Sequence, residues 1–428
     1  MRYLMLALVW VAFIYGEDSL QHATVSAYAV DMETGEVLVN ENSDKSLIPG
    51  SCIKVVTTAA ALHLLGSQAQ FETQLEYDGN LTIRGGGDPC LGSNRISSVL
   101  PWKKQIEAWA NAFEKLGIRT IEGDVIGDAT LWEKASAPPS WAFEDLGNYY
   151  GAGASALSFH ENLYALFFKP GTKVGESAAI LRTEPVIPAL VLQNEVKTGA
   201  VGSGDGACIY GIEFSLQQTV RGTVPAGVQE FSIKGSIPDP AAFCAQLLSQ
   251  ELQRRGIKIL KKPPNPAKKI IVHTTTSPPL SEIIYWTNQK SINLYAEHLL
   301  KKMGEKAQQE GSTSAGIQAV REFLKKEQVD LDGFNMVDGS GLSRKNLMTT
   351  KQLVAVLLKM KKSEHFPVFF ESLPSRDSKV RAKSGSMSLI RGCCGYAGNV
   401  AFAILINQCT DSQAMKAKID SFLAQLSP

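Results

Sequence analysis

The chain has 428 residues, 44% hydrophobic and 20% charged, so it is long enough for two or three globular domains and is neither fibrous nor disordered. Its 43 basic and 42 acidic side chains give a formal net charge of +1, which provides no bulk field to draw it to nucleic acid or anionic lipid. We therefore expect no nucleic-acid partner and expect any ligand to be recognised locally.

Residues 1–16 resemble a secretory signal peptide. One positive charge at Arg2 precedes a short apolar run, and the small Gly16 stands before polar residues. The apolar run is too short to span a membrane, and no later run of about 18 apolar residues follows. We expect a periplasmic or otherwise extracytoplasmic protein with no transmembrane segment in the mature chain.

The segment Ser51-Cys52-Ile53-Lys54 lies between a Pro49-Gly50 break and an alanine-rich run that favours helix. On a helix that begins near Ser51, the Ser51 hydroxyl and the Lys54 amine share a face, which places a nucleophile beside a possible base. Lysine acts as a base only when neutral, and burial disfavours its charged form. A capping serine beside a solvated lysine would give the same pattern, but no other serine in this chain has a lysine three residues later.

Predicted elements follow along the chain in three groups. A β-hairpin is predicted before Ser51. Short strands and turns are predicted after residue 71, and they include the glycine triplet 85–87. This triplet is predicted as a tight turn, because it lacks the Gly-Lys-Ser/Thr of a phosphate-binding loop. The remaining expectations are a helix over 106–116, a strand-like stretch over 157–168, a β-rich region over 172–238, a helix over 241–255 and helices from 281 to the amphipathic C-terminus.

Two triplets downstream offer partners for Ser51. Ser291-Ile292-Asn293 stands at a predicted helix start, and Lys383-Ser384-Gly385 at the start of a predicted strand. Each triplet alone carries almost no information. In this order behind Ser-x-x-Lys, they form the three-motif set of penicillin-recognising serine enzymes.

With these motifs the chain resembles the class C low-molecular-mass penicillin-binding proteins, the D-alanyl-D-alanine carboxypeptidase and endopeptidase family. The resemblance covers about residues 25–407, and Lys383-Ser384-Gly385 departs from the usual Lys-Thr-Gly by one methyl group. It rests on several further stretches: Gly-Gly-Gly-Asp-Pro at 85–89, Gly-Asp at 123–124, Ala-Ser-Ala-Leu-Ser at 154–158, Asn-Leu-Tyr-Ala-Glu at 293–297 and Asp-Gly-Ser-Gly-Leu-Ser-Arg at 338–344.

The resemblance implies an α/β (α+β) fold in which a transpeptidase-like domain, an antiparallel sheet flanked by helices, is interrupted by a two-domain insertion. We expect the catalytic domain over 17–70 and 276–428. We expect inserted domain II over 71–171 and 239–275, and the β-rich inserted domain III over 172–238.

The resemblance also implies roles for individual residues, with Ser51 as nucleophile, Lys54 as base, Ser291 as proton relay and Asn293 as the group that positions Lys54. The backbone N–H groups of Ser51 and Ser386 would form the oxyanion hole. The other residues expected to bind substrate are Lys383, Ser384 and Gly385 for the terminal carboxylate, and Asp145, Arg344, Leu342, Met387 and Tyr150 for the peptide side chain.

The implied activity is serine-type cleavage of D-alanyl-D-alanine in peptidoglycan stem peptides, with β-lactam antibiotics as covalent inhibitors. No cofactor is expected, and a metal site is not expected because neither Cys-x-x-Cys nor His-Glu-x-x-His occurs. A β-lactamase is one alternative, although no residue suggests itself as a dedicated deacylating base. A non-catalytic wall-binding protein is another, although it would be expected to show decayed motifs.

Overall fold

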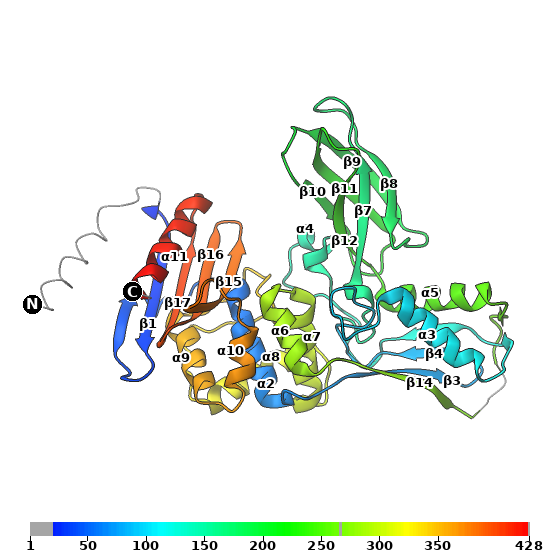
Figure 1. Cartoon of the computed structure of the whole chain (residues 1–428), viewed down its shortest axis with the longest axis horizontal. Coiled ribbons are helices and arrows are strands. Elements are labelled where there is room, and N and C mark those ends of the chain that lie inside the picture. Colours follow the sequence, from blue (N-terminus) through cyan, green and yellow to red (C-terminus); the bar gives the residue numbers. More distant parts are fainter. Residues whose placement is uncertain (1–19, 265–267, 427–428) are drawn as a thin grey trace, which may run out of the picture.

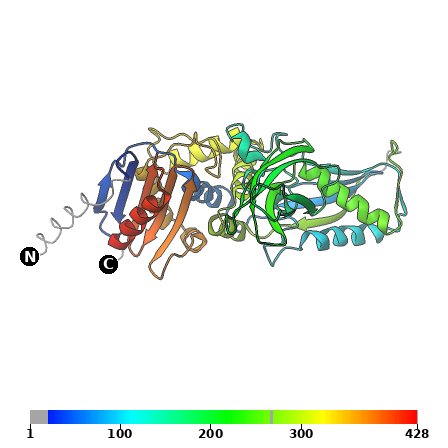
Figure 2. The same ribbon diagram turned by 90° about the horizontal axis from the view of Figure 1, so that it is seen from above.

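The computed structural model describes residues 20–264 and 268–426, so the predicted signal peptide lies outside the described residues. The molecule has a sheet-and-helix part that contains both chain termini and an elongated insertion beside it, from which a β-rich lobe projects (Figure 1). Figure 2 shows the same arrangement from above, with the insertion extending away from the terminal sheet. No helix among the described residues is long and apolar enough to cross a membrane.

A five-stranded antiparallel sheet joins the two ends of the chain, because the first strand pairs with the last along its whole length. The C-terminal helix α11 (Ser412–Leu426) packs on one face of this sheet through Ile419 and Phe422. The strand order is β15 (Val380–Met387), β16 (Ile390–Ala397), β17 (Val400–Asn407), β1 (Thr24–Asp31) and β2 (Val37–Glu41).

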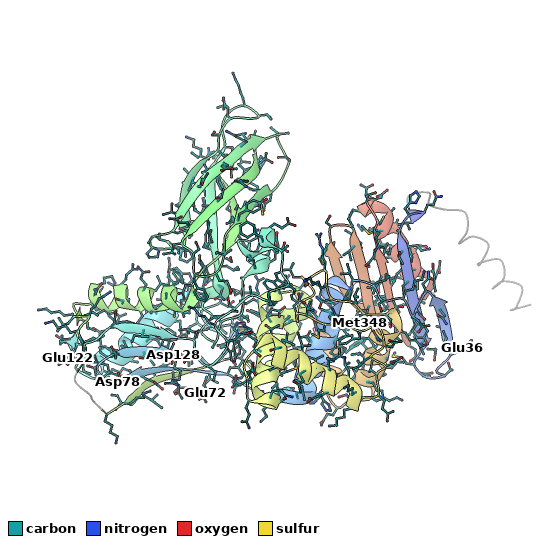
Figure 3. All side chains as sticks on the ribbon, turned by 180° about the vertical axis from the view of Figure 1, so that it is seen from behind. Glu36, Glu72, Asp78, Glu122, Asp128 and Met348 are labelled. Atoms are coloured by element: carbon teal, nitrogen blue, oxygen red, sulfur yellow. The ribbon has the colours of Figure 1, made fainter. Side chains whose placement is uncertain are left out.

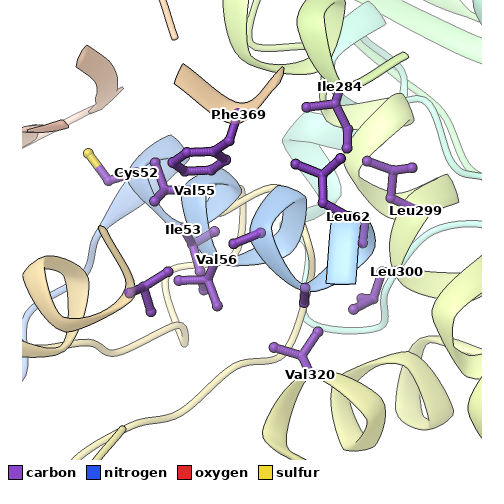
Figure 4. Packing of buried hydrophobic residues seen from close by; sticks show 14 of the residues in the cluster. Cys52, Ile53, Val55, Val56, Leu62, Ile284, Leu299, Leu300, Val320 and Phe369 are labelled. Carbon is purple, nitrogen blue, oxygen red and sulfur yellow. The ribbon is translucent and has the colours of Figure 1, made fainter. Parts of the chain in front are cut away.

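The opposite face is covered by helices around a central helix, α2 (Lys54–Leu65), which is preceded by a single 3₁₀ turn, η2 (Gly50–Ile53). Nine of its twelve residues are buried, which explains why an almost uniformly apolar sequence forms this helix. Figure 4 shows Leu62 of α2 between Ile284 and Leu299. The surrounding helices are α6 (Leu280–Gln289), α7 (Asn293–Gln308), α8 (Thr313–Lys326), α9 (Thr350–Lys361) and α10 (Phe366–Ser372).

The insertion has its own buried core, in which Trp109 and Phe113 of one helix face Leu248 of another. Glu72, Asp78, Glu122 and Asp128 mark this part of the molecule in Figure 3, whereas Glu36 and Met348 mark the terminal part. Its elements are β3 (Glu72–Tyr77), β4 (Leu81–Arg84), β6 (Val125–Asp128) and β14 (Ile270–Thr276) in one sheet, β5 (Thr120–Ile121) and β13 (Lys258–Ile259) in a second, and the helices α3 (Trp102–Glu114) and α5 (Pro240–Arg254).

The projecting lobe consists of two three-stranded sheets, and its base carries short helical turns that reach the terminal part. These turns are α4 (Phe143–Leu146), η3 (Tyr149–Gly151) and η4 (His160–Asn162). The sheets contain β10 (Gly206–Tyr210), β11 (Gln217–Pro225) and β9 (Val191–Gly199), and β12 (Phe231–Ser236), β7 (Leu163–Lys169) and β8 (Ala179–Glu184).

The expected antiparallel sheet flanked by helices is confirmed, while the domain limits stay a prediction. Two local expectations were wrong. Lys383-Ser384-Gly385 lies in the middle of β15 rather than at its start. The strand predicted over 157–168 begins only at Leu163, because 160–162 form a left-handed turn in which Asn162 Oδ1 accepts the Phe159 N–H.

Candidate active site

Ser51 and Lys54 meet at the point where the chain turns into α2. Ser51 belongs to the 3₁₀ turn and Lys54 is the first residue of the α-helix, and this spacing leaves both side chains on one side of the turn. The Lys54 Nζ atom lies 3.0 Å from Ser51 Oγ. Lys54 is completely buried, whereas Ser51 lines a cavity.

The Lys54 amine has two further partners, and both are acceptors. Its Nζ donates to Asn293 Oδ1 at 2.7 Å and to the Ser340 carbonyl at 2.6 Å. The amide of Asn293 is oriented by its own Nδ2, which donates to the Tyr150 carbonyl at 2.8 Å. A neutral amine has two N–H groups, so these two acceptors use both and leave the nitrogen lone pair for the Ser51 hydroxyl proton.

The pKa of Lys54 lies well below its ordinary value. Burial is the main cause, because a charged amine loses its hydration inside the protein, and the nearby positive charge of Lys383 lowers the pKa further. The negative charges of Asp338 and Glu297 oppose this shift in part. The geometry and the lowered pKa together suit Lys54 to accept a proton from Ser51.

Two buried carboxylates hold the segment that carries the Ser340 carbonyl. Glu297 of α7 accepts the backbone N–H groups of Gly339, at 3.0 Å, and Ser340, at 2.8 Å. Asp338 accepts the N–H groups of Gly341 and Ser343 at 2.7 and 2.6 Å. Burial and the charge of Asp338 raise the pKa of Glu297 to about 7. The acceptor for Lys54 is therefore positioned by acidic side chains that do not touch the cavity.

The other three motif residues with hydroxyl or amine groups lie around this arrangement. Ser291 lies between α6 and α7 with φ of +55°, a strained conformation for a residue with a side chain. Lys383 is buried, its Nζ donates to the Ser384 carbonyl at 2.6 Å, and burial lowers its pKa. Ser384 is exposed on β15.

Gly385 brings β15 against the turn that carries Ser51. A Cβ atom at this position would lie 2.6 Å from the Pro49 carbonyl oxygen and 3.0 Å from the Ser51 nitrogen, so a side chain would push the strand away. A Cβ on Gly50 would lie 3.6 Å from the Ser386 nitrogen. These contacts bring the backbone N–H groups of Ser51 and Ser386 to the same region, as an oxyanion site requires.

Ser51 opens onto a cavity of about 530 Å³ between β15, the 338–344 segment and the lobe. Some of the predicted site residues that the structure describes do not line this cavity: Lys54, Ser291, Lys383, Ser384 and Gly385. The predicted residues that line it are Ser51, Asn293, Ser386, Met387, Leu342, Arg344, Asp145 and Tyr150.

Asp145 and Arg344 lie close enough within this wall to influence each other electrostatically. Burial is the main cause that raises the pKa of Asp145, with Glu144 acting in the same direction, and the charge of Arg344 opposes both. Asp145 comes from α4 at the base of the lobe, so the cavity is bounded by both the terminal part and the insertion.

Sequence reasoning missed several residues of the site. Cys208 and Tyr210 of β10 line the cavity, but they are more than 150 residues from Ser51 and no motif marks them. Glu297 and Ser340 lie in two of the stretches that carry the family resemblance, but no role was predicted for them. The spacing could have indicated Glu297, because it lies four residues after Asn293 and therefore on the same face of α7. Within residues 20–264 and 268–426, no group of three or more His, Cys, Asp or Glu residues is placed to hold a metal ion.

The sequence of the chain is similar to that of one known protein family. The model of the D-Ala-D-Ala carboxypeptidase 3 (S13) family matches residues 11–426. The chain is 28% identical to the D-alanyl-D-alanine carboxypeptidase of Actinomadura sp. (strain R39), over 92% of this chain and 79% of that protein.

Solved structures agree on the fold. Penicillin binding protein 4 (dacB) from Haemophilus influenzae superposes with a TM-score of 0.76 at 22% identity, over 92% of both chains. The same protein complexed with a novel β-lactam gives a TM-score of 0.73 at 22% identity, over 95% of this chain and 96% of that one.

We expect Lys54→Ala to fold normally and to be acylated by benzylpenicillin about 100- to 10,000-fold more slowly than the wild type, the range for loss of a general base. In the wild type, the acylation rate should rise with pH as Lys54 loses its proton and level off well below pH 10.5, because the pKa of Lys54 is lowered. Stopped-flow acylation rates across pH would measure both effects. A near-normal rate in Lys54→Ala would remove Lys54 from the mechanism.

Glu297→Gln tests the positioning of the Ser340 carbonyl. The amide oxygen of a glutamine can still accept from the Gly339 and Ser340 N–H groups, but these hydrogen bonds lose their negative charge and weaken, so we expect the plateau acylation rate to fall about 10-fold. The loss of negative charge beside Lys54 should also lower the pKa of Lys54 and move the rising limb of the pH profile to lower pH. Glu310→Gln, an exposed carboxylate just after α7, is the matched control and should leave rate and profile unchanged. If Glu297→Gln lost stability but the rising limb of the pH profile stayed in place, Glu297 would have a purely structural role.

Proposed function

The chain belongs to the D-Ala-D-Ala carboxypeptidase 3 (S13) family, and we propose that it cleaves the terminal D-alanyl-D-alanine bond of peptidoglycan stem peptides through an acyl-enzyme on Ser51. The observation that carries this proposal is the contact of 3.0 Å between Ser51 Oγ and the amine of a completely buried Lys54, at the edge of an open cavity. Cleavage of cross-links between stem peptides by the same chemistry is part of the proposal.

Acylation begins when Ser51 Oγ attacks the carbonyl carbon between the two D-alanines. The hydroxyl proton moves to the neutral Lys54 amine, whose other two N–H groups stay with Asn293 and Ser340. The carbonyl oxygen takes the negative charge and is stabilised by the backbone N–H groups of Ser51 and Ser386.

The tetrahedral intermediate formed by this attack then collapses, which breaks the peptide bond and leaves an ester on Ser51. The departing nitrogen takes a proton that Ser291 relays from Lys54, so D-alanine leaves as a neutral amine. Water then attacks the ester by the same route in reverse, which releases the shortened peptide and returns the proton to Ser51 Oγ.

The carboxylate of the terminal D-alanine is assigned to β15. The Ser384 hydroxyl is exposed on this strand, and Lys383 contributes positive charge from behind it. A carboxylate beside these groups gains charge-assisted interactions that an amide would not make. Gly385 allows the strand to approach Ser51 closely enough for both ends of the substrate to bind.

The peptide side chain is assigned to the part of the cavity walled by Asp145, Arg344 and Tyr150. Asp145 supplies a carboxylate for an ammonium group, and Leu342 and Met387 supply apolar surface for the methylene chain. A side chain of the diaminopimelate type fits this combination, because it presents an amine at the end of an aliphatic stem.

The proposal places the protein in the periplasm or an equivalent extracytoplasmic space, where its substrate is found. A secretory signal over residues 1–16 and inhibition by β-lactam antibiotics belong to the same proposal. Support for the inhibition comes from the related fold of penicillin binding protein 4 from Haemophilus influenzae, which has been solved with a β-lactam bound.

Ser51→Ala is expected to abolish both covalent labelling by penicillin and release of D-alanine while leaving the protein folded, because the hydroxyl nucleophile is lost. Intact-mass spectrometry would measure one penicillin adduct on the wild type and none on the variant. Circular dichroism would check the fold. Labelling that persists in Ser51→Ala would contradict the assignment, and rapid nitrocefin turnover without a stable adduct would indicate a β-lactamase.

Asp145→Asn tests recognition of the side-chain amine. We would compare kcat/KM for a tripeptide ending in D-Ala-D-Ala that carries a free amine with that for its N-acetylated twin. Loss of the carboxylate should reduce the preference for the free amine by about 10- to 150-fold, the worth of one charge-assisted contact, and should hardly change acylation by simple penicillins. Glu310→Gln, an exposed carboxylate outside this cavity, is the control and should keep the wild-type preference. An equal preference in wild type and Asp145→Asn would show that the amine is recognised elsewhere.

A further inference from the structure

A second cavity in the described part of the chain is larger than the one that contains Ser51. It has a volume of about 920 Å³ and lies where the N-terminus of α3 meets strands β7, β8 and β12 of the lobe. It shares no lining residue with the Ser51 cavity. The residues that matter for its chemistry are Arg95, Trp102, Lys103, His160, Glu161 and Lys234.

The cavity wall carries an excess of positive charge. Its two carboxylates are already paired, since Glu161 accepts Arg95 at 3.1 Å and Glu184 accepts Arg182 at 2.7 Å. Within residues 20–264 and 268–426, neither Lys103 nor Lys234 has a carboxylate within ion-pair distance. Lys234 lies near enough to His160 to lower the pKa of that imidazole. Two unpaired amines on one cavity wall attract an anion.

The cavity is bordered by a left-handed turn. His160, Glu161 and Asn162 have φ angles of +55°, +55° and +53°, a conformation that is strained for residues with a side chain. Side-chain hydrogen bonds hold the turn in place: Asn162 Nδ2 donates to the Gly153 carbonyl at 2.9 Å, and Glu161 accepts from Ser93 Oγ at 2.7 Å. Strain that is held this firmly is typical of sites that present a side chain to a ligand.

The side chain that this turn presents to the cavity wall is His160, whose ring centre lies 5.9 Å from that of Trp102. Burial lowers the pKa of His160, and a backbone hydrogen bond at Gly92 opposes this shift in part. Its Nδ1 atom is buried and makes no hydrogen bond within the described residues. The Lys103 amine lies 5.3 Å from the centre of the Trp102 ring, which places a cation beside the indole.

We propose that this cavity binds an acidic saccharide, a sugar that carries a carboxylate or a phosphate. The indole of Trp102 offers a flat surface for a sugar ring, His160 borders the same wall, and Lys103 and Lys234 supply positive charge for the anion. The inference rests on the proposed function in one respect, because a wall peptidase meets its peptide attached to a glycan. A saccharide held here would tether the enzyme to the polymer while Ser51 acts on the peptide.

The test uses the full chain after reaction with benzylpenicillin, so that the Ser51 cavity is blocked. Three probes are compared by isothermal titration calorimetry: N-acetylmuramic acid, N-acetylglucosamine 6-phosphate and neutral N-acetylglucosamine. We expect at least one acidic probe to bind at least 10-fold more tightly than the neutral sugar. We expect a Lys103→Ala/Lys234→Ala double variant to lose at least 10-fold in affinity for that probe, and Trp102→Leu to weaken all three probes.

Lys173→Ala, which removes an exposed lysine outside the cavity, is the matched control and should bind like the wild type. Equal affinity for acidic and neutral sugars, undiminished affinity in the double variant, or no binding of any probe would overturn the proposal. The intact mass of the same sample reports acylation of Ser51. A missing penicillin adduct therefore contradicts the proposed function, whereas an adduct without saccharide binding contradicts this inference alone.

Discussion

The proposed active site depends on one buried amine, that of Lys54, which lies beside a hydroxyl and whose pKa is lowered. Lys54 has no exposed surface, and its amine is surrounded by Ser51 Oγ, Asn293 Oδ1 and the Ser340 carbonyl at 2.6–3.0 Å. A lysine in such a place costs folding free energy unless its polar atoms are satisfied. The two acceptors satisfy two N–H groups, and within residues 20–264 and 268–426 no carboxylate contacts the amine, which suits the proposed role of its lone pair.

That arrangement explains why segments far apart in the sequence must be packed together. Asn293 is contributed by the start of α7, and the Ser340 carbonyl by a segment that Glu297 and Asp338 hold through backbone N–H groups. The carboxylates are close enough to tune the pKa of Lys54 electrostatically while their hydrogen bonds go to the backbone. The same acids therefore contribute both to the shape of the site and to the protonation state of the base.

The insertion contributes to the substrate cavity as well as enlarging the molecule. Asp145 and Tyr150 at the base of the lobe, with Cys208 and Tyr210 on β10, close the side of the cavity opposite β15. The lobe also borders the second, larger cavity, in which unpaired lysines accompany a tryptophan and a strained histidine. The molecule thus has two separate concave surfaces, and the charged side chains that line them differ.

Spacing in the sequence determined that Ser51 and Lys54 share one side of a helical turn. The order of the three triplets supported the family resemblance, and that resemblance implied an antiparallel sheet flanked by helices. These are local or pattern-level properties, since a turn fixes which neighbours meet. Only the tertiary structure decided that the Ser340 carbonyl accepts from the amine while Glu297 holds the Ser340 backbone, that Ser384 is exposed while Lys383 is buried, and that Tyr210 lines the cavity. Those contacts join residues separated by up to about 290 positions, and no local propensity encodes them because they arise from the packing of the sheet, the helices and the insertion.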